Sequence, residues 1–287
     1  MRSDITYVVI DTLNHSLTAR ALELSNDRFP LKNALIFSDK ADHWSGREII
    51  KIPEIKCTKD YNSVVFCELP KHLKTDFALF IQYDGFVLSG ELFSEQYLNW
   101  DYIGAPWPHY SDYTVGNGGF SLRSKKLVNS IEKYLLPDDF NTAEDVVICR
   151  YLRARLEANH DLRFAPEKVA EMFSYEMRKP EFETFGFHGL SHLPELMVGE
   201  IGELFEHLQP QSVAKFFRSF SAACEKLPID GRTLFNQYCF RHQTEMLHFY
   251  RHAFSTNRIE LLNLLSKLLN QDQEPLQVYP LPNLRLQ

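Results

Sequence analysis

The chain has 287 residues, of which 44% are apolar and 13% aromatic. This length and composition suit one large α/β domain with a smaller appendage and argue against disorder over most of the chain. The formal net charge of −7 gives no overall positive field that would attract nucleic acid, so no nucleic-acid partner is expected.

The cysteines and the N-terminus point to a cytoplasmic protein. The five cysteines are widely spaced and include no CxxC pair, which disfavours a zinc or redox motif and fits a reducing compartment. The N-terminus lacks the regions of a signal peptide, and no apolar run approaches the roughly 20 residues of a membrane span. We therefore expect no transmembrane segment, and any membrane contact would be peripheral, at the inner face.

Short apolar runs alternate with helical patterns in the first part of the chain. Strands are predicted at residues 5–10, 34–37 and 76–82, and helices at residues 16–26 and 60–72. This alternation predicts an α/β fold with a mainly parallel sheet flanked by helices. Ligands of such sheets collect at the carboxyl ends of the strands.

Three aspartates lie within two residues after the ends of the predicted strands: Asp11, Asp39 and Asp84. An aspartate in this position is also a common turn former. Asp84 carries more weight, because Gly85 lets the backbone turn closely past a ligand. Its carboxylate oxygens suit a hard divalent ion whose coordination is completed by phosphate.

A glycine-rich stretch follows at residues 115–123 (VGNGGFSLR). We expect a loop whose backbone approaches a substrate and whose Phe120 and Leu122 anchor it in the core. Tight turns use the same residue types, so the pattern alone is a weak indication of function.

An acidic pair, Glu144 and Asp145, begins the next predicted helix. Acidic residues in a first turn also suit the helix dipole, and Asn141 or Thr142 could cap this helix, so a structural role competes with a catalytic one. The predicted apolar face of the helix comprises Val146, Val147, Cys149, Tyr151 and Leu152.

After about residue 195 the patterns are helical only. Two apolar stripes have helical spacing: Val213, Phe216, Phe217, Phe220 and Cys224, and then Leu261, Leu262, Leu265, Leu268 and Leu269. We predict one domain over residues 1–195 and a helical region over residues 196–287, with an extended tail from Gln271 onward. His242, His248 and His252 could suggest a second metal site, but no carboxylate or cysteine pattern supports one.

Six stretches of the sequence occur together in a characteristic order. They are QYDGF (82–86), DYIGAPW (101–107), VGNGGFSLRS (115–124), AEDVVICR (143–150), FAPEKVAEMFSYE (164–176) and FGFHG (185–189). Together they resemble a mostly bacterial domain family of poorly defined function that is grouped with the GT-A fold glycosyltransferases. The resemblance covers roughly residues 75–190 and implies a GT-A-like (Rossmann-like), nucleotide-sugar-binding catalytic domain over residues 1–195.

On the donor side, the resemblance implies a metal site at Asp84 and His188. Asp84 would be the last aspartate of the Asp-X-Asp motif, and Gln82 would bind the donor in place of the first aspartate, which usually contacts the ribose. His188 would complete the metal site; read without the resemblance, a histidine among glycines and aromatic residues would be a packed, hydrogen-bonded one. Asp39 would contact the base or ribose.

On the acceptor side, the resemblance implies that Gly118 and Gly119 form the loop beside the donor sugar and the acceptor. Glu144 and Asp145 would be the acidic pair that meets the acceptor. We expect Asp145 to be the general base of an inverting transfer, with Glu144 as the alternative base or a hydrogen-bonding partner of the acceptor.

The expected activity is therefore that of a Mn²⁺- or Mg²⁺-dependent glycosyltransferase, as used in polysaccharide biosynthesis. Its donor would be a UDP- or GDP-sugar and its acceptor a glycan or glycoconjugate. A nucleotidyltransferase is one alternative, but residues 11–20 lack the glycines usual near its N-terminus. The other is a non-catalytic module that binds a sugar or a protein; the helical region would pack on the domain or serve as a docking element.

Overall fold

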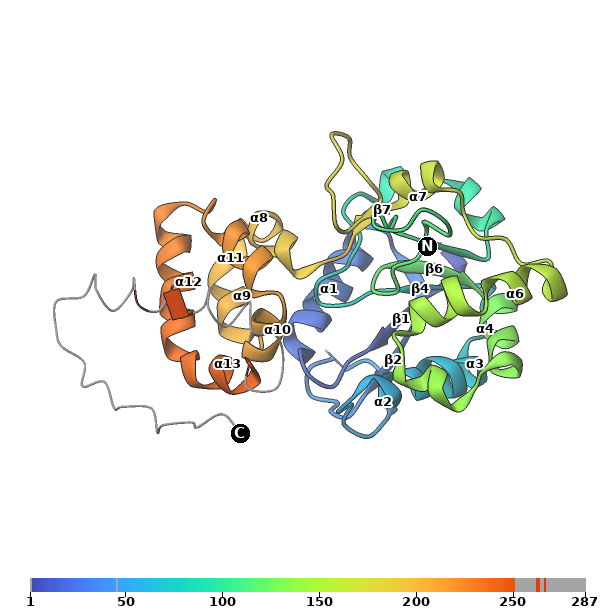
Figure 1. Ribbon diagram of the computed structural model, residues 1–287, viewed down its shortest axis with the longest axis horizontal. Helices are drawn as coiled ribbons and strands as arrows, with labels where there is room; N and C mark the ends of the chain where they lie inside the picture. The colour runs from blue at the N-terminus through green and yellow to red at the C-terminus, as the bar shows by residue number, and fades with distance from the viewer. Residues whose placement is uncertain (1, 45, 251–261, 264–265, 267–287) are drawn as a thin grey trace. The chain divides into compact units, whose positions relative to one another are not determined.

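The computed structural model describes residues 2–44, 46–250, 262–263 and 266 (Figure 1). Contacts divide the chain into two compact units, Met1–Leu193 with His207–Gln209 and Pro194–Glu206 with Pro210–Gln287. The first unit contains every strand of the described residues, and the second is helical. A catalytic role for residues 1–195 and a separate role for residues 196–287 stay predictions.

A six-stranded sheet in the order β3-β2-β1-β4-β6-β5 forms the centre of the first unit. Its strands are β1 (Arg2–Ile10), β2 (Leu31–Ser38), β3 (Ile50–Lys51), β4 (Phe77–Phe80), β5 (Tyr102–Gly104) and β6 (Ser121–Ser124). β1, β2, β3 and β4 are parallel, whereas β6 runs antiparallel to both β4 and β5. The predicted α/β class with a mainly parallel sheet is confirmed.

A second, two-stranded sheet pairs β7 (Ser174–Tyr175) in parallel with β8 (Gly186–Phe187). Helices of the first unit are α1 (His15–Arg28), α2 (Thr58–Ser63), α3 (Leu69–His72), α4 (Lys125–Ser130), α5 (Glu144–Val146), α6 (Arg153–His160) and α7 (Glu167–Phe173). The predicted glycine-rich loop ends in strand β6. Phe120 directly precedes this strand and Leu122 lies within it, and both side chains are fully buried as expected.

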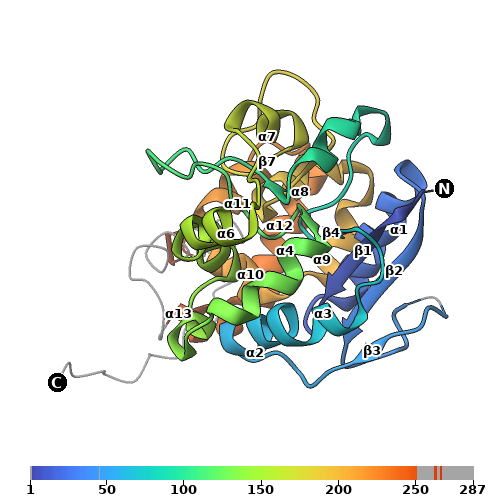
Figure 2. The same ribbon diagram turned by 90° about the vertical axis from the view of Figure 1, so that its right-hand side faces the viewer.

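Alternate residues of the central strands pack into two apolar clusters on opposite faces of the sheet. Val8 and Phe80 belong to one cluster, which also includes residues of α3, α4 and α6. Tyr7 and Leu79 belong to the other, which includes residues of α1 and α7. Figures 1 and 2 show α3 and α4 lying side by side. Because both faces are covered, the parallel strands are continuous apolar runs.

Two helical segments widen into π turns, at Val64–Glu68 and Val147–Tyr151. A π turn contains an additional residue and rotates the residues after it around the helix axis. Ile148 and Cys149 are consequently buried, whereas Tyr151 is 59% exposed. The predicted apolar face of this helix is therefore wrong at Tyr151.

The second unit contains α9 (Ile201–His207), α10 (Pro210–Lys215), α11 (Phe217–Cys224), α12 (Ile229–Arg241) and α13 (Gln243–Tyr250), and α8 (Leu193–Leu196) begins beside the boundary. The predicted stripe from Val213 to Cys224 is divided between α10 and α11. Phe216 lies at the break, where the backbone leaves the helical conformation, and it is 43% exposed instead of buried.

Some predictions for the C-terminal region fall on residues outside the described ranges. These are His252, Leu261, Leu265, Leu268, Leu269 and the tail from Gln271 onward. Within the described ranges, none of the helices combines the length and the apolar character needed to cross a membrane.

Candidate active site

Asp84 occupies a tight turn just beyond the carboxyl end of β4. Gln82 and Gly85 exchange two backbone hydrogen bonds, of 2.9 and 3.0 Å, so that Tyr83 and Asp84 form the turn between them. The Asp84 side chain is buried, and its backbone carbonyl accepts a hydrogen bond of 2.7 Å from the Gly189 N–H. The turn is thus fixed to the segment that contains His188.

His188 directly follows β8, which positions it against the Asp84 turn. Its backbone N–H donates to the Tyr175 carbonyl over 2.8 Å, and Val87, just after the turn, forms a β-bridge with Gly186. The His188 Nε2 atom lies 3.6 Å from Asp84 Oδ1. The two predicted metal ligands, distant in sequence, are therefore neighbours in the fold.

The other ring nitrogen of His188 faces two side chains. His188 Nδ1 lies 3.1 Å from Glu176 Oε1 and 2.9 Å from Asn117 Nδ2. Asn117 is buried and has a left-handed backbone conformation with φ of 59°, which asparagine tolerates better than most residues. These contacts fix the orientation of the imidazole ring.

The two carboxylates change the ionisation of His188. Burial alone lowers the pKa of the imidazole, but the charges of Asp84 and Glu176 outweigh that effect and raise it to about 9. For Glu176, burial raises the pKa, yet the hydrogen bond and charge of His188 hold it below its usual value. The site is built around a positive charge between two carboxylates.

Glu144 and Arg123 form a buried ion pair under the glycine loop. Their side chains are 8% and 1% exposed, and an Arg123 Nη2 group donates to Glu144 Oε1. The same Nη2 group donates to the Gly118 carbonyl over 3.2 Å, and the guanidinium lies 3.8 Å from the centre of the Phe80 ring. Glu144 is therefore neutralised by a fixed cation.

Asp145 accepts hydrogen bonds from backbone N–H groups. Its Oδ2 accepts from Gly118 over 2.9 Å, and its Oδ1 accepts from Val146 over 2.8 Å. Burial and the charge of Glu144 nevertheless raise the pKa of Asp145 to about 6. The helix begins at Glu144 without a side-chain cap from Thr142 or Asn141, so the predicted cap is absent and the acidic pair itself bonds the first N–H groups.

Two glycines of the loop each accommodate one of these side chains. A Cβ atom on Gly118 would lie 2.1 Å from Glu144 Oε1, and a Cβ atom on Gly119 would lie 2.1 Å from His188 Nε2. Both distances are far below van der Waals contact. The glycines are needed here so that the charged side chains can approach the loop, a packing role that the sequence did not reveal.

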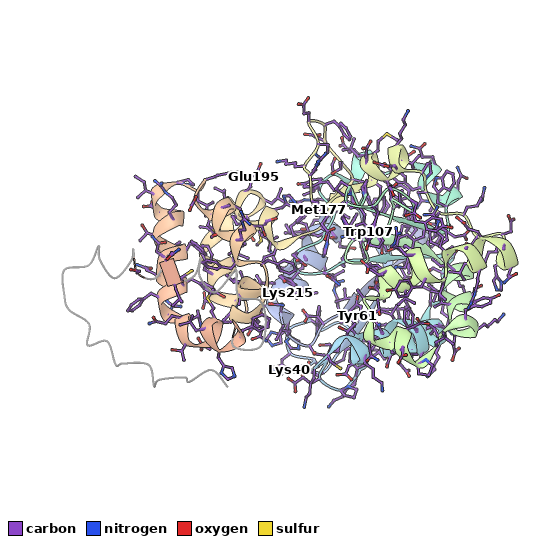
Figure 3. All side chains as sticks on the ribbon, in the orientation of Figure 1. Lys40, Tyr61, Trp107, Met177, Glu195 and Lys215 are labelled. Atoms are coloured by element: carbon purple, nitrogen blue, oxygen red, sulfur yellow. The ribbon has the colours of Figure 1, made fainter. Side chains whose placement is uncertain are left out.

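Gln82 and Asp39 were both predicted to contact the donor, but only Gln82 contacts a residue of the site. Gln82 is beside the site, with Oε1 3.3 Å from His188 Nε2 and Nε2 3.3 Å from the hydroxyl of Tyr61, a residue of α2 labelled in Figure 3. Asp39 follows β2 and instead contacts His15, with Oδ1 2.7 Å from Nε2.

Asp11, the remaining strand-end aspartate, has a local structural role. Its Oδ1 accepts from the backbone N–H groups of Leu13 and Asn14, over 2.6 and 2.9 Å, at the start of α1. This turn offers no glycine-rich phosphate cradle, and so no observation favours the nucleotidyltransferase alternative.

Asp84 and His188 fit a hard divalent ion that arrives with a phosphate group. Their facing oxygen and nitrogen atoms are close enough to bind one ion, and the contact between His188 Nδ1 and Glu176 is the outer support that metal-binding histidines commonly have. In the part of the chain that the structure describes, no three His, Cys, Asp or Glu side chains form a complete metal cluster. Mg²⁺ and Mn²⁺ commonly complete such sites with phosphate and water.

Sequence reasoning missed several residues of this site: Tyr61, Asn117, Arg123 and Glu176. Arg123 was detectable as the only charged residue in the strand sequence Ser121–Ser124. Glu176 gave no comparable signal, because glutamates at the end of a helical stretch are common on protein surfaces.

The comparison with family profiles finds one match, to a family without an assigned activity. The profile of a family described as "Protein of unknown function (DUF5672)" matches residues 60–188. This range covers the stretches from Gln82 to His188 on which the family resemblance was based. No curated protein matches the sequence.

Comparisons of structure find glycosyltransferases at low identity. A glycosyltransferase involved in the glycosylation of the major capsid of PBCV-1 aligns with 64% of this chain and 91% of its own, at 13% identity and a TM-score of 0.44. A mannosyltransferase from Pyrobaculum calidifontis, in complex with GDP-Man and Mn²⁺, aligns with 95% and 89%, at 8% identity and a TM-score of 0.42.

The galactosyltransferase LgtC, in complex with donor and acceptor sugar analogues, aligns with 65% of this chain and 86% of its own, at 8% identity and a TM-score of 0.35. At TM-scores below 0.5 these likenesses carry no weight for substrate or reaction. The chemistry of this chain has to be inferred from its own site residues.

Proposed function

We propose that this protein is a metal-dependent glycosyltransferase of the GT-A type, which transfers a sugar from a UDP- or GDP-sugar to a glycan or glycoconjugate. The observation that carries the proposal is the convergence of Asp84, His188 and Asp145 on one glycine loop. Asp84 and His188 face each other at 3.6 Å, and Asp145 accepts from the Gly118 N–H at 2.9 Å.

Asp84 and His188 would hold the metal ion, either Mn²⁺ or Mg²⁺. The ion would neutralise the departing diphosphate. Glu176 and Asn117 keep the imidazole ring oriented, and Glu176 would withdraw some of the positive charge that the ion places on His188. Gln82 lies within hydrogen-bond distance of both His188 and Tyr61 and would line the donor side.

Asp145 would be the general base. A pKa of about 6 leaves it ionised at neutral pH, yet much closer to the operating pH than an ordinary aspartate, which favours proton transfer. The acceptor hydroxyl would give its proton to Asp145 while its oxygen bonds to the anomeric carbon. The bond from that carbon to the diphosphate breaks on the opposite face, so the transfer inverts the configuration.

Glu144 is less suited to this task than Asp145. Its carboxylate is bound by the Arg123 guanidinium and is only 8% exposed, whereas Asp145 makes its fixed hydrogen bonds with backbone N–H groups. To accept a proton, Glu144 would have to give up its ion pair with Arg123. Glu144 would instead hold Arg123 and Gly118 in place beneath the base.

Isothermal titration calorimetry with UDP and GDP tests the proposal. We expect binding in Mn²⁺ that is lost in EDTA, and hydrolysis of a UDP- or GDP-sugar under the same conditions. Asp84→Asn should abolish the Mn²⁺-dependent binding of the nucleotide, whereas Asp138→Asn, at an exposed aspartate, should bind as wild type does. Equal nucleotide affinity in EDTA and Mn²⁺, or unchanged binding in Asp84→Asn, would refute the metal-dependent transfer.

A further inference from the structure

A cavity of about 310 Å³ lies beside α7 and the segment between β7 and β8. Its walls include Pro106, Glu171, Ser174 and Phe182. This volume is at the lower end of the range for small-ligand pockets, about 300–1,000 Å³. Met177, in the same segment, is labelled in Figure 3 and is 57% exposed. Of the donor-side residues described above, only Glu176 lines this cavity.

The cavity adjoins the candidate active site through two residues. Glu176 lines the cavity and also contacts His188 Nδ1 at 3.1 Å. Glu167 also lines the cavity and accepts a hydrogen bond of 2.9 Å from the hydroxyl of Thr114, next to the first residue of the glycine loop. A molecule in the cavity would therefore lie next to the residues that would bind metal and donor.

The charges of the wall disfavour an anionic occupant. Four glutamates and two cationic residues line the cavity: Glu167, Glu171, Glu176, Glu181, Arg178 and Lys179. Glu176 is balanced by His188, but the other glutamates still outnumber Arg178 and Lys179, and this excess of carboxylates would repel the diphosphate of a nucleotide or the carboxylate of an acidic sugar. The same carboxylates are strong acceptors for hydroxyl groups.

One wall residue suits the apolar surface of a sugar ring. Phe182 is 51% exposed, and the face of its ring can attract the C–H groups of a pyranose. Ser174 also lines the cavity, but its side chain is fully buried, so its hydroxyl has no surface for a ligand to contact.

We infer that this cavity binds the acceptor and that the acceptor presents a neutral saccharide. The inference rests on the proposed function, because only a sugar transfer gives the occupant its role as acceptor. Glu171 and Phe182 then determine acceptor affinity without contacting the donor. The cavity wall meets the start of the glycine loop through the hydrogen bond between Thr114 and Glu167, and the same loop contacts Asp145 through the Gly118 N–H.

Saturation-transfer NMR with methyl glycosides of glucose, galactose and mannose tests the inference, in the presence of Mn²⁺ and UDP or GDP. Methyl glucuronide serves as the anionic comparison. We expect at least one neutral glycoside to bind better than the glucuronide. Glu171→Gln replaces a charge-assisted hydrogen bond with a weaker neutral one, and Phe182→Ala removes a stacking contact. Each change should weaken that binding about fivefold.

Glu132→Gln and Leu136→Ala change an exposed glutamate and an exposed apolar residue that do not line the cavity, and they should leave glycoside binding unchanged. Absence of neutral glycoside binding, equal or tighter glucuronide binding, or no effect of both cavity variants would overturn the inference. Calorimetry of the nucleotide separates the two failures, since intact Mn²⁺-dependent nucleotide binding would leave the proposed function standing. Glycoside binding without any nucleotide binding would refute both, and indicate a sugar-binding module.

Discussion

Two groups of charged side chains meet successive glycines of one loop, and they differ in how their charges are balanced. At Gly118, the carboxylate of Glu144 is neutralised by Arg123, a permanent cation fixed by hydrogen bonds and aromatic rings. At Gly119, the carboxylates of Asp84 and Glu176 share one imidazole, which carries a positive charge only when protonated. The positive charge of Arg123 is permanent, whereas the proton on His188 can be replaced by another cation.

This difference suggests two roles: Glu144 and Arg123 support the structure, and the group around His188 takes part in the chemistry. A permanent buried ion pair holds the loop and the start of α5 in place, and losing either partner leaves an unpaired charge. An exchangeable proton can give way to a divalent ion, because metal binding to histidine requires the deprotonated ring. Asp145 lies at the boundary, since it adjoins the permanent pair but makes its own hydrogen bonds with backbone N–H groups.

The largest expected effect comes from Asp145→Asn, which removes the proposed base but keeps the shape of the side chain. The turnover number should fall by about 10² to 10⁴, while nucleotide affinity stays within about twofold. Donor consumption and product formation, measured alongside calorimetry, check this expectation. Near-normal turnover, or a product that retains the donor's anomeric configuration, would contradict the assignment of the base.

Arg123→Met tests the permanent pair. Because it leaves the buried Glu144 carboxylate without its cation, we expect the free energy of unfolding to fall by about 3–5 kcal/mol. Urea unfolding measures the change. Arg150→Gln is the control, since Arg150 pairs with the exposed Asp112 and its loss should affect stability much less. Equal losses in the two variants would remove the distinction between a supporting and a surface pair.

Glu176→Gln tests whether the group around His188 binds a metal ion. The amide keeps a hydrogen-bond acceptor beside His188 Nδ1 but loses the charge that supports a metal-bound imidazole. Removing such an outer partner typically costs about 10- to 100-fold in metal affinity. Titration of Mn²⁺ in saturating UDP or GDP measures this loss. An unchanged affinity would mean that Glu176 merely balances the protonated ring.

The pH dependence gives the smallest effect over a single pH unit. Asp145 must be ionised to accept a proton, and its pKa is raised to about 6, so protonation inactivates it as the pH falls below that value. The turnover number should then decrease about tenfold for each further pH unit. Donor and acceptor are kept saturating at each pH. A rate that stays constant down to about pH 4, near the ordinary aspartate pKa, would argue against a raised Asp145 pKa in the reacting complex.

The strands that position the site could be predicted from the sequence, but the contacts between its side chains could not. Continuous apolar runs before Asp39 and Asp84 revealed the parallel strands, because strands covered on both faces carry no alternating pattern. The family resemblance indicated Asp84 and His188 together, and the β-bridge between Val87 and Gly186 explains how the fold joins them. No periodicity could have predicted that contact.

Other features depend on tertiary packing that local patterns do not record. Tyr151 turned out to be exposed because a π turn changes the helical phase, and Phe216 because the helix breaks there. Asp39 has the expected place at the end of β2 but contacts His15, a residue with no distinguishing sequence context. The burial of Arg123 follows from its position on β6 between Phe80 and Tyr102.

The central claim is that Asp84 and His188 bind a divalent ion together with the diphosphate of a nucleotide-sugar. A crystal structure with Mn²⁺ and UDP or GDP, in which manganese is located by its anomalous scattering, tests it most directly. We predict one manganese ion bonded to an Asp84 carboxylate oxygen, to His188 Nε2 and to phosphate oxygens, with Glu176 still bound to Nδ1. Bound nucleotide with no manganese at this position, or with His188 still paired to Asp84, would contradict it.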